Sequence, residues 1–252
     1  MPAAKRKRLR PTEVPLVLYS AVSKKALRRA IETRYLRRPS GKPLVLYERR
    51  RQAARRSTGT QAMVRIAARA AVRSGAVFYW GQGETIEVAR VPLKYVGCAK
   101  LPWWLRGVPV IDAAGGVVLT SGPKPRVLLL SKSDGKARRW VLPKGKRARA
   151  EARRRAARRE VIEESGLAKV DVGAFLQRER YFDIENGRVV FKEVSYYFMR
   201  CPKGKTRLRV NRAEGFKSGQ WMPIDKALNV TNPVRAHRSL RKARSIANSR
   251  QR

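Results

Sequence analysis

Residues 145–167, with the sequence GKRARAEARRRAARREVIEESGL, constrain this chain more than any other stretch. From Glu151 to Glu164 the segment is rich in Ala and Arg and contains neither Gly nor Pro, which predicts a helix. On such a helix Glu160, Glu163 and Glu164 stand at positions i, i+3 and i+4, so they share one face. Three clustered carboxylates repel one another unless a cation lies between them.

Carboxylate oxygens in that number suit Mg2+ or Mn2+, and both ions also bind phosphate oxygens. We therefore expect Glu160, Glu163 and Glu164 to bind a divalent metal. The alternative is an ordinary surface helix whose arginines pair with the glutamates. We favour the metal site because acidic residues are scarce: the chain has 18, and Glu151 and these three glutamates fall within this one stretch.

The same stretch resembles the Nudix box, G-x5-E-x7-R-E-U-x-E-E-x-G-U with U apolar, and matches every fixed position. The segment WVLPKG at 140–145 resembles the Nudix branch that cleaves diadenosine polyphosphates and diphosphoinositol polyphosphates. The resemblance covers roughly residues 108–240. It implies an α+β fold in which a mixed sheet lies between helices as an α/β/α sandwich, preceded here by a smaller α/β domain.

The resemblance also assigns roles to residues of the box. Glu160 and Glu164 would be the main metal ligands, and Glu163 a ligand or the catalytic base. Arg159 would pair with Glu151 or Glu163 and hold the geometry of the loop and helix. The positions with a structural role are Gly145, Glu151 and Gly166, the last where a helix commonly ends on a left-handed glycine.

The catalytic base of Nudix enzymes often lies outside the box, and Glu214 stands where some members carry it. Glu193 is the other candidate. On the substrate side, the cations Lys144, Lys146 and Arg147 lie in the loop before the helix, where they favour a long or highly charged polyphosphate. The alternative is that these side chains are solvated and belong to the general excess of positive charge.

That excess is extreme, with a formal net charge of +42 and a pI near 11.6. Such a surface attracts polyanions, nucleic acid above all. Two cysteines give no disulfide framework, and the single histidine argues against serine–histidine catalysis. No apolar run approaches the length of a membrane span. We therefore expect a cytoplasmic protein with no membrane association.

The chain divides into a basic disordered tail (1–12), a basic α/β domain (13–100), a Nudix domain (101–240) and a basic C-terminal tail (241–252). In the basic domain, Ser23 can cap a helix, and residues 76–79 and 85–89 read as paired strands. Trp103 and Trp104, near the boundary, could stack on a base, but we favour packing at a domain junction.

The basic domain weakly resembles the ADP-ribosyltransferase-like half of RNA 2'-phosphotransferases. The resemblance rests on LVLYSAVSKKALRRAIETRYL, on the next strand LVLYERRRQAA, and on SGAVFYWGQGETIEVARVPLKYV. That family has a His-Gly pair in the first strand, where this chain has Ser20 and Ala21. The resemblance therefore implies a degenerate copy that keeps an RNA- or phosphate-binding role; a generic small α/β module is the alternative.

Together these features predict a Mg2+-dependent (or Mn2+-dependent) pyrophosphohydrolase that cleaves a phosphoanhydride bond in a nucleoside polyphosphate, such as a dinucleoside polyphosphate. RNA is a further expected partner, through the basic domain. Two alternatives stay open: an RNA- or ribosome-associated binding protein that uses the Nudix fold as a scaffold, and an RNA 5'-end pyrophosphohydrolase.

Overall fold

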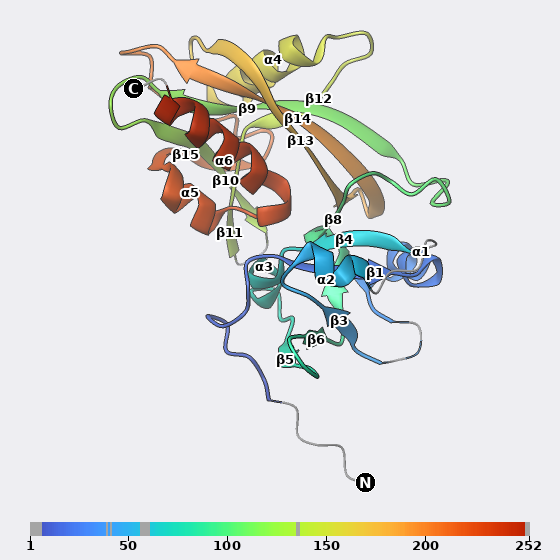
Figure 1. Ribbon diagram of the computed structural model, residues 1–252. Helices are drawn as coiled ribbons and strands as arrows, with labels where there is room; N and C mark the ends of the chain where they lie inside the picture. The colour runs from blue at the N-terminus through green and yellow to red at the C-terminus, as the bar shows by residue number, and fades with distance from the viewer. Residues whose placement is uncertain (1–6, 39, 41, 56–60, 135–136, 250–252) are drawn as a thin grey trace. The chain divides into compact units, whose positions relative to one another are not determined.

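The structure, a computed structural model, describes residues 7–38, 40, 42–55, 61–134 and 137–249 (Figure 1). It divides into two compact units. Unit 1 comprises Met1–Pro109 together with Arg180–Phe191, and unit 2 comprises Val110–Glu179 together with Lys192–Arg252. Each unit is described separately below.

Unit 1 is a small α/β unit built from short elements. In chain order these are β1 (Leu18–Val22), α1 (Lys24–Thr33), β2 (Tyr35–Leu36), β3 (Leu44–Leu46), α2 (Arg50–Arg55), β4 (Ala62–Ile66), α3 (Ala68–Val72), β5 (Phe78–Trp80), β6 (Ile86–Val88), β7 (Val91–Pro92), a 3-10 turn (Leu93–Tyr95) and β8 (Val96–Cys98). Strands β1, β4 and β8 pair in that order, β3, β6 and β5 form a second sheet, and β2 pairs with β7.

Two local predictions for unit 1 are confirmed. Ser23 caps α1, because its hydroxyl accepts a hydrogen bond from the Ala26 amide at 3.2 Å. The expected pairing of residues 76–79 with residues 85–89 is the antiparallel hairpin of β5 and β6. Phe78 of β5 and the alternate residues Ile86 and Val88 of β6 point into one apolar core, whereas Trp80 at the end of β5 is exposed.

The chain end differs from the expected disordered tail where it is described. Leu9 is buried in the core of unit 1, and its amide donates to the Phe78 carbonyl at 2.9 Å. The Trp80 amide likewise donates to the Lys7 carbonyl at 2.9 Å. Residues 7–9 therefore line the free edge of β5, which satisfies backbone groups that the hairpin leaves open. Residues 1–6 lie outside the described residues.

Unit 2 is a sheet with helices on both faces. Its elements are β9 (Val110–Thr120), β10 (Arg126–Asp134), β11 (Ala137–Val141), β12 (Lys144–Lys146), α4 (Arg153–Ser165), β13 (Asp171–Glu185), β14 (Arg188–Cys201), β15 (Phe216–Pro223), α5 (Ile224–Val230) and α6 (Pro233–Ser249). The strand order is β13-β14-β9-β10-β11, with β12 on β9 and β15 on β10.

The layers of unit 2 follow from the alternation along β9. Ala114 and Val118 pack with α4, whereas Val117 and Leu119 are buried on the opposite face, to which α6 contributes (Figure 1). The helices α5 and α6 thus cover the face opposite α4. This arrangement confirms the expected α/β/α sandwich, and the α/β unit that precedes it confirms the expected fold class.

The connection between β13 and β14 is a two-residue turn at Asn186 and Gly187. Asn186 (φ 47°) and Gly187 (φ 74°) both adopt the left-handed conformation that such a turn requires. Within unit 1 the hairpin end joins β8 through the pairing of Tyr181 with Gly97. At the C-terminus, residues 241–249, expected in a basic tail, continue the helix α6, which buries Ala243 and Ala247.

Candidate active site

The helix α4 holds two glutamates on its buried side. Glu160 is 7% exposed and Glu164 is 3% exposed, although both carry a carboxylate. The helix lies close to the sheet because β9 has a glycine beneath it: a Cβ on Gly116 would meet the Met199 sulfur at 2.6 Å and a Val161 methyl at 2.9 Å. The small residues Ala156 and Ala157 pack in the same layer, so the backbone of α4 is fixed against the sheet.

The loop before α4 passes directly over these carboxylates. The Lys144 amide donates to Oε2 of Glu164 at 2.8 Å. A Cβ built on Gly145 would lie 1.7 Å from Oε2 of Glu160, so a side chain at that position is incompatible with the observed carboxylate. The strand β12 holds this loop in place through its pairing with β9, in which Gly145 lies opposite Ala114.

Arg159 joins the loop to the helix. Its guanidinium binds Glu151 with two hydrogen bonds of 2.9 and 3.0 Å, Glu160 at 2.7 Å and Glu163 at 2.9 Å. It also donates to the Lys146 carbonyl at 3.1 Å. The planar guanidinium has five N–H donors and uses all five here, whereas a lysine ammonium has only three. The hydrogen bonds from Arg159 and the Ala148 amide lower the pKa of Glu151 to about 2.

The buried carboxylates are electrostatically perturbed. Burial raises the pKa of Glu164 to about 7, against the attraction of Lys144 and Lys132. Burial likewise raises the pKa of Glu160, opposed by the hydrogen bond from Arg159. The charge of Glu214 raises the pKa of both groups further. Perturbed carboxylates of this kind cluster at functional sites.

A comparison with protein-family models identifies the family to which this helix, its glutamates and the glycine loop belong. A model of the NUDIX domain matches residues 110–243, which is more than half of the chain. The chain belongs to the Nudix family. It is therefore a hydrolase that acts on pyrophosphate bonds. No curated protein matches the sequence.

Several solved Nudix structures are similar to this chain. An Ap4A hydrolase of C. elegans in a binary complex is 22% identical, with a TM-score of 0.46 over 55% of this chain and 98% of that one. A MutT protein from Methanosarcina mazei Go1 is 19% identical, with a TM-score of 0.41 over 58% and 98%. The dihydroneopterin triphosphate pyrophosphohydrolase of E. coli is 17% identical, with a TM-score of 0.42 over 54% and 92%.

The Nudix site fits a divalent metal by its donor chemistry, although the expected ligands do not all converge. Glu160 and Glu164 place buried carboxylate oxygens beside the loop, and Glu214 is in electrostatic reach of both. Glu163 is half exposed and bonds to Arg159. In the described part of the chain, no three Asp, Glu, His or Cys side chains are gathered closely enough to form a ready-made metal cluster.

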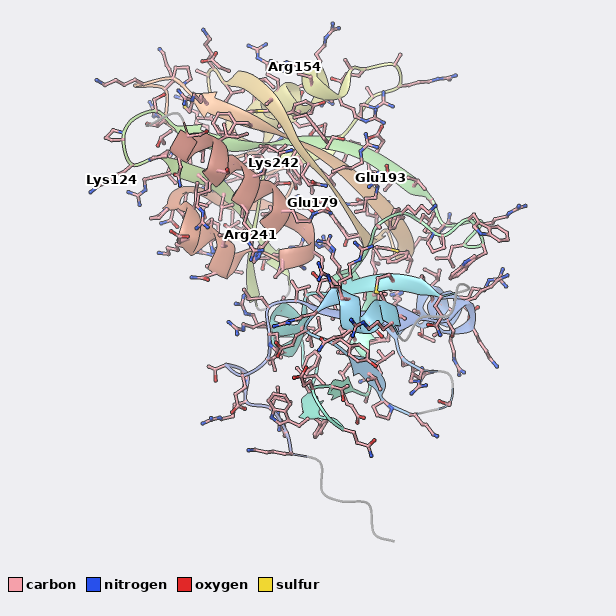
Figure 2. The ribbon with its side chains drawn as sticks, viewed as in Figure 1. Lys124, Arg154, Glu179, Glu193, Arg241 and Lys242 are labelled. Carbon is pink, nitrogen blue, oxygen red and sulfur yellow. The ribbon has the colours of Figure 1, made fainter. Side chains whose placement is uncertain are left out.

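The two candidates for the base have different surroundings in the Nudix domain. Glu214 lies on an exposed loop, where its carboxylate accepts a hydrogen bond from the Asn211 amide group at 3.1 Å. Its charge raises the pKa of both buried glutamates, so it lies within electrostatic reach of the site. Glu193, on β14, forms an ion pair with Arg178 at 3.5 Å. Figure 2 shows Glu193 together with the charged side chains that project from both units.

The expected loop cations divide in the same way. Lys144 is half-buried and attracts the Glu164 carboxylate, and Lys146 is exposed. Arg147 instead binds the Asp112 carboxylate at 2.9 Å and the Glu151 carbonyl at 2.8 Å. Its guanidinium therefore holds the loop to β9, a role that differs from the expected contact with substrate phosphate.

Sequence reasoning missed Lys132 of β10. Its ammonium lies 3.9 Å from the centre of the Phe216 ring. The pKa of Lys132 is lowered, because burial and the charge of Lys144 outweigh the opposing effect of Glu164 and Glu214. A signal was available: Lys132 continues the alternation of Leu128 and Leu130, which face α4. A lysine at the end of that face stands beside the glutamates.

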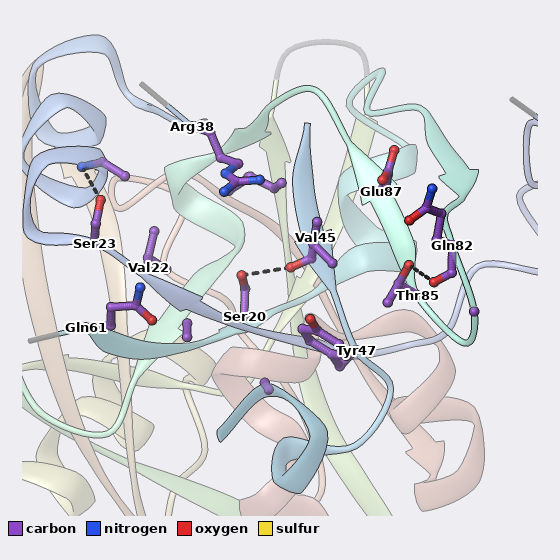
Figure 3. Close-up of a pocket in the computed structure, with 15 residues that line it drawn as sticks. Ser20, Val22, Ser23, Arg38, Val45, Tyr47, Gln61, Gln82, Thr85 and Glu87 are labelled. Atoms are coloured by element: carbon purple, nitrogen blue, oxygen red, sulfur yellow. Dashed lines mark hydrogen bonds between the residues drawn. The ribbon is translucent and has the colours of Figure 1, made fainter. Parts of the chain in front are cut away.

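Unit 1 contains a separate cavity of about 640 Å3 (Figure 3). Ser20 and Ala21 line it, where the resemblance to RNA 2'-phosphotransferases places the His-Gly pair. The Ser20 hydroxyl donates to the Val45 carbonyl at 3.0 Å. The only histidine of the chain, His237, lies in α6 of unit 2.

Within the part of the chain that the structure describes, none of the helices combines the length and the apolar character of a membrane span.

Proposed function

We propose that the protein is a Mg2+-dependent Nudix pyrophosphohydrolase that cleaves a phosphoanhydride bond in a nucleoside polyphosphate, with a dinucleoside polyphosphate as the favoured class. The observation that carries this proposal is the pair of buried glutamates under a glycine loop. Burying a carboxylate costs several kcal/mol unless a cation or hydrogen bonds compensate for it. A fold that keeps both Glu160 and Glu164 there retains them for chemistry.

Glu160 and Glu164 would hold the metal, with Glu163 as a further ligand once its bond to Arg159 is exchanged. Bound Mg2+, or Mn2+ in its place, would neutralise diphosphate charge and activate the attacking water. Glu214 would take the proton of that water, because it is solvent-exposed and in electrostatic reach of both buried glutamates.

The cations beside the carboxylates would bind the rest of the polyphosphate. Lys132 and Lys144 lie close enough to Glu164 to change its pKa, so they can neutralise phosphate oxygens near the scissile bond. Lys146 is exposed at the rim and would contact a longer chain of phosphates. This arrangement and the WVLPKG segment at 140–145 favour a substrate with four or more negative charges over a short nucleoside diphosphate.

The test is turnover of a substrate panel with Mg2+: diadenosine polyphosphates, nucleoside triphosphates, ADP-ribose, diphosphoinositol polyphosphate and 5'-triphosphate RNA. We expect hydrolysis of a diadenosine polyphosphate that Glu164→Gln abolishes. Asp225→Asn is the matched control, because Asp225 is an exposed carboxylate of α5 that pairs with Arg244. Preferred turnover of 5'-triphosphate RNA would replace the substrate class by RNA ends.

The alternative function, an RNA-binding scaffold without catalysis, is favoured by the net charge of +42. The buried glutamates oppose it, because a scaffold gains nothing from carboxylates that are costly to bury. An absence of turnover with every substrate in the panel, together with RNA binding that Glu164→Gln leaves unchanged, would support the scaffold.

A further inference from the structure

A groove of about 370 Å3 on unit 1 lies between α1 and the segment 103–108. Trp103 lines this groove and is 77% exposed, the highest value among the large apolar side chains of the described residues. Large aromatic side chains are usually mostly buried, so a largely exposed indole at the wall of a groove is a candidate contact for a ligand. This outcome differs from the packing role that we expected for Trp103 from the sequence.

The backbone around Trp103 is fixed. Trp104 packs against the apolar core of unit 1, and Leu105 is buried. The Leu105 amide donates to the Pro102 carbonyl at 2.9 Å, which closes a turn with Trp103 inside it. From the other side of the groove, the Arg28 guanidinium donates to the Trp104 carbonyl at 3.2 Å. The backbone that carries the exposed indole is therefore held in place on both sides.

The helix α1 supplies positive charge beside the indole. Its buried face consists of Ala26, Leu27 and Ala30, and its exposed side chains include Lys24, Lys25, Arg28 and Arg29. These four cations line an open depression of about 610 Å3 that shares Lys24 and Arg28 with the groove. Each pair four residues apart is separated by one helical turn, about 6 Å along the axis. Arg106 adds a fifth cation, and Glu32 is the one acidic residue that lines either hollow.

We propose that this groove binds single-stranded nucleic acid, with one base stacked on Trp103 and the adjoining phosphates on the cations of α1. An aromatic platform beside a basic track is the arrangement that recognises single strands without sequence preference. A duplex keeps its bases stacked inside and would offer only phosphates. An anionic membrane would be expected to engage several apolar side chains, whereas the exposed rim of this groove offers Trp103 alone. The site goes beyond the proposed hydrolase activity and does not depend on it.

The experiment measures fluorescence anisotropy of labelled single-stranded RNA and DNA, about 10 nucleotides long, with the full chain in EDTA so that no turnover occurs. Trp103→Ala should weaken binding about tenfold, whereas Trp103→Phe, which keeps a stacking ring, should stay within about threefold of the original chain. The double variant Lys25→Gln/Arg29→Gln should lower the slope of log K against log salt by about 1.4, since each phosphate contact contributes about 0.7.

Two matched variants on unit 2 serve as controls. Phe175→Ala removes another exposed ring, and Lys203→Gln/Arg207→Gln removes the same number of exposed charges. Neither should change affinity or salt slope by as much as its counterpart on unit 1. Three results would overturn the proposal. Trp103→Ala could bind the single strand as tightly as the original chain, or the original chain could bind a duplex of the same length as tightly as the single strand. Trp103→Ala could also lose binding to anionic vesicles while it keeps its binding to the single strand. Circular dichroism of each variant separates lost binding from lost folding.

Discussion

Glu160 and Glu164 are neighbours on α4, yet each has a different means of tolerating burial. Glu160 accepts a charged hydrogen bond from Arg159, and Glu164 accepts a hydrogen bond from the backbone amide of Lys144. Neither contact fully offsets the loss of water, because the pKa of both side chains stays raised. The positions of these two carboxylates therefore depend on how closely the loop at Gly145 approaches.

Replacement of Gly145 tests this dependence. In Gly145→Ala the new Cβ would displace the Glu160 carboxylate, which lies 1.7 Å from its position. We expect hydrolysis to fall about 100-fold, since a displacement of about 1 Å is sufficient for such a loss. Gly173→Ala is the control, because its Cβ would meet no carboxylate and no atom closer than 3.1 Å, its neighbours being the Phe198 ring at 3.1 Å and the Phe198 carbonyl oxygen at 3.2 Å. Unchanged turnover in Gly145→Ala would show that the loop does not set the carboxylate geometry.

His237 makes stability depend on pH. Burial and the charge of Arg241 lower its pKa to about 4, from an unfolded value near 6.5. The unfolded chain therefore binds the extra proton first, and stability present above pH 6.5 is lost as the pH falls toward 4. The full effect is roughly 3 kcal/mol. Urea unfolding between pH 7 and pH 4 should show a smaller loss in His237→Gln than in the original chain; equal losses would contradict this assignment.

At the scale of elements, the end of α4 sets where the loop after it runs. Gly166 ends the helix with φ at +67°, and a Cβ there would lie 2.3 Å from the Arg209 carbonyl. The Arg209 amide in turn donates to the Ser165 carbonyl at 2.9 Å. This contact docks the segment that leads to Glu214, so the cap links the box to the proposed base.

Alanine substitution at two glycines distinguishes the stability cost of a left-handed backbone from that of a steric clash. Gly166→Ala should lower the free energy of unfolding by about 2–3 kcal/mol, since it combines a left-handed alanine with a steric clash. Gly204 also has a left-handed φ, of +75°, but no atom lies within 4 Å of its Cβ position. Gly204→Ala should therefore cost only about 1 kcal/mol. Denaturant titration would contradict this account if the two variants were equally stable.

Much of this element could be predicted from the sequence, because its pattern is local. The helix expected from Glu151 to Glu164 runs from Arg153 to Ser165, and the shared face of Glu160 and Glu164 follows from its period. The orientation of Glu163 could not be predicted, because Arg159 has three carboxylates within reach and the sequence does not rank them.

Other features depended on contacts distant in sequence. Leu9 is a lone apolar residue among cations, and only the open edge of β5 explains its burial. Arg147 resembles its basic neighbours in the sequence, and Asp112, 35 residues earlier, decides its role. Lys132 could have been found by extending the alternation of β10 by one step.

At the scale of the whole molecule, the Nudix match and the compact units do not coincide. The match covers residues 110–243, but its segment Arg180–Phe191 belongs to unit 1. There Phe182 and Phe191 are fully buried and stack edge to face, with ring centres 5.1 Å apart. Unit 1 is therefore completed by a hairpin end from the Nudix part of the chain.

A fragment of residues 110–252 tests whether the hairpin end depends on the rest of unit 1. Without the rest of unit 1, Phe182 and Phe191 lose their core, so we expect the fragment to bind a hydrophobic dye strongly and to aggregate. Phe182→Ser/Phe191→Ser in the same fragment should reduce both effects. A soluble, dye-negative fragment with the original phenylalanines would show that the hairpin end does not need unit 1.

The central claim, that the buried glutamates of α4 make this chain a metal-dependent pyrophosphohydrolase, is tested most directly by a Mg2+ titration of diadenosine polyphosphate hydrolysis. The account predicts turnover that rises with Mg2+, is lost by more than about 100-fold in Glu160→Gln and Glu164→Gln, and is unaffected in Asp225→Asn. Turnover that persists in both glutamine variants, or that is independent of Mg2+, would contradict it.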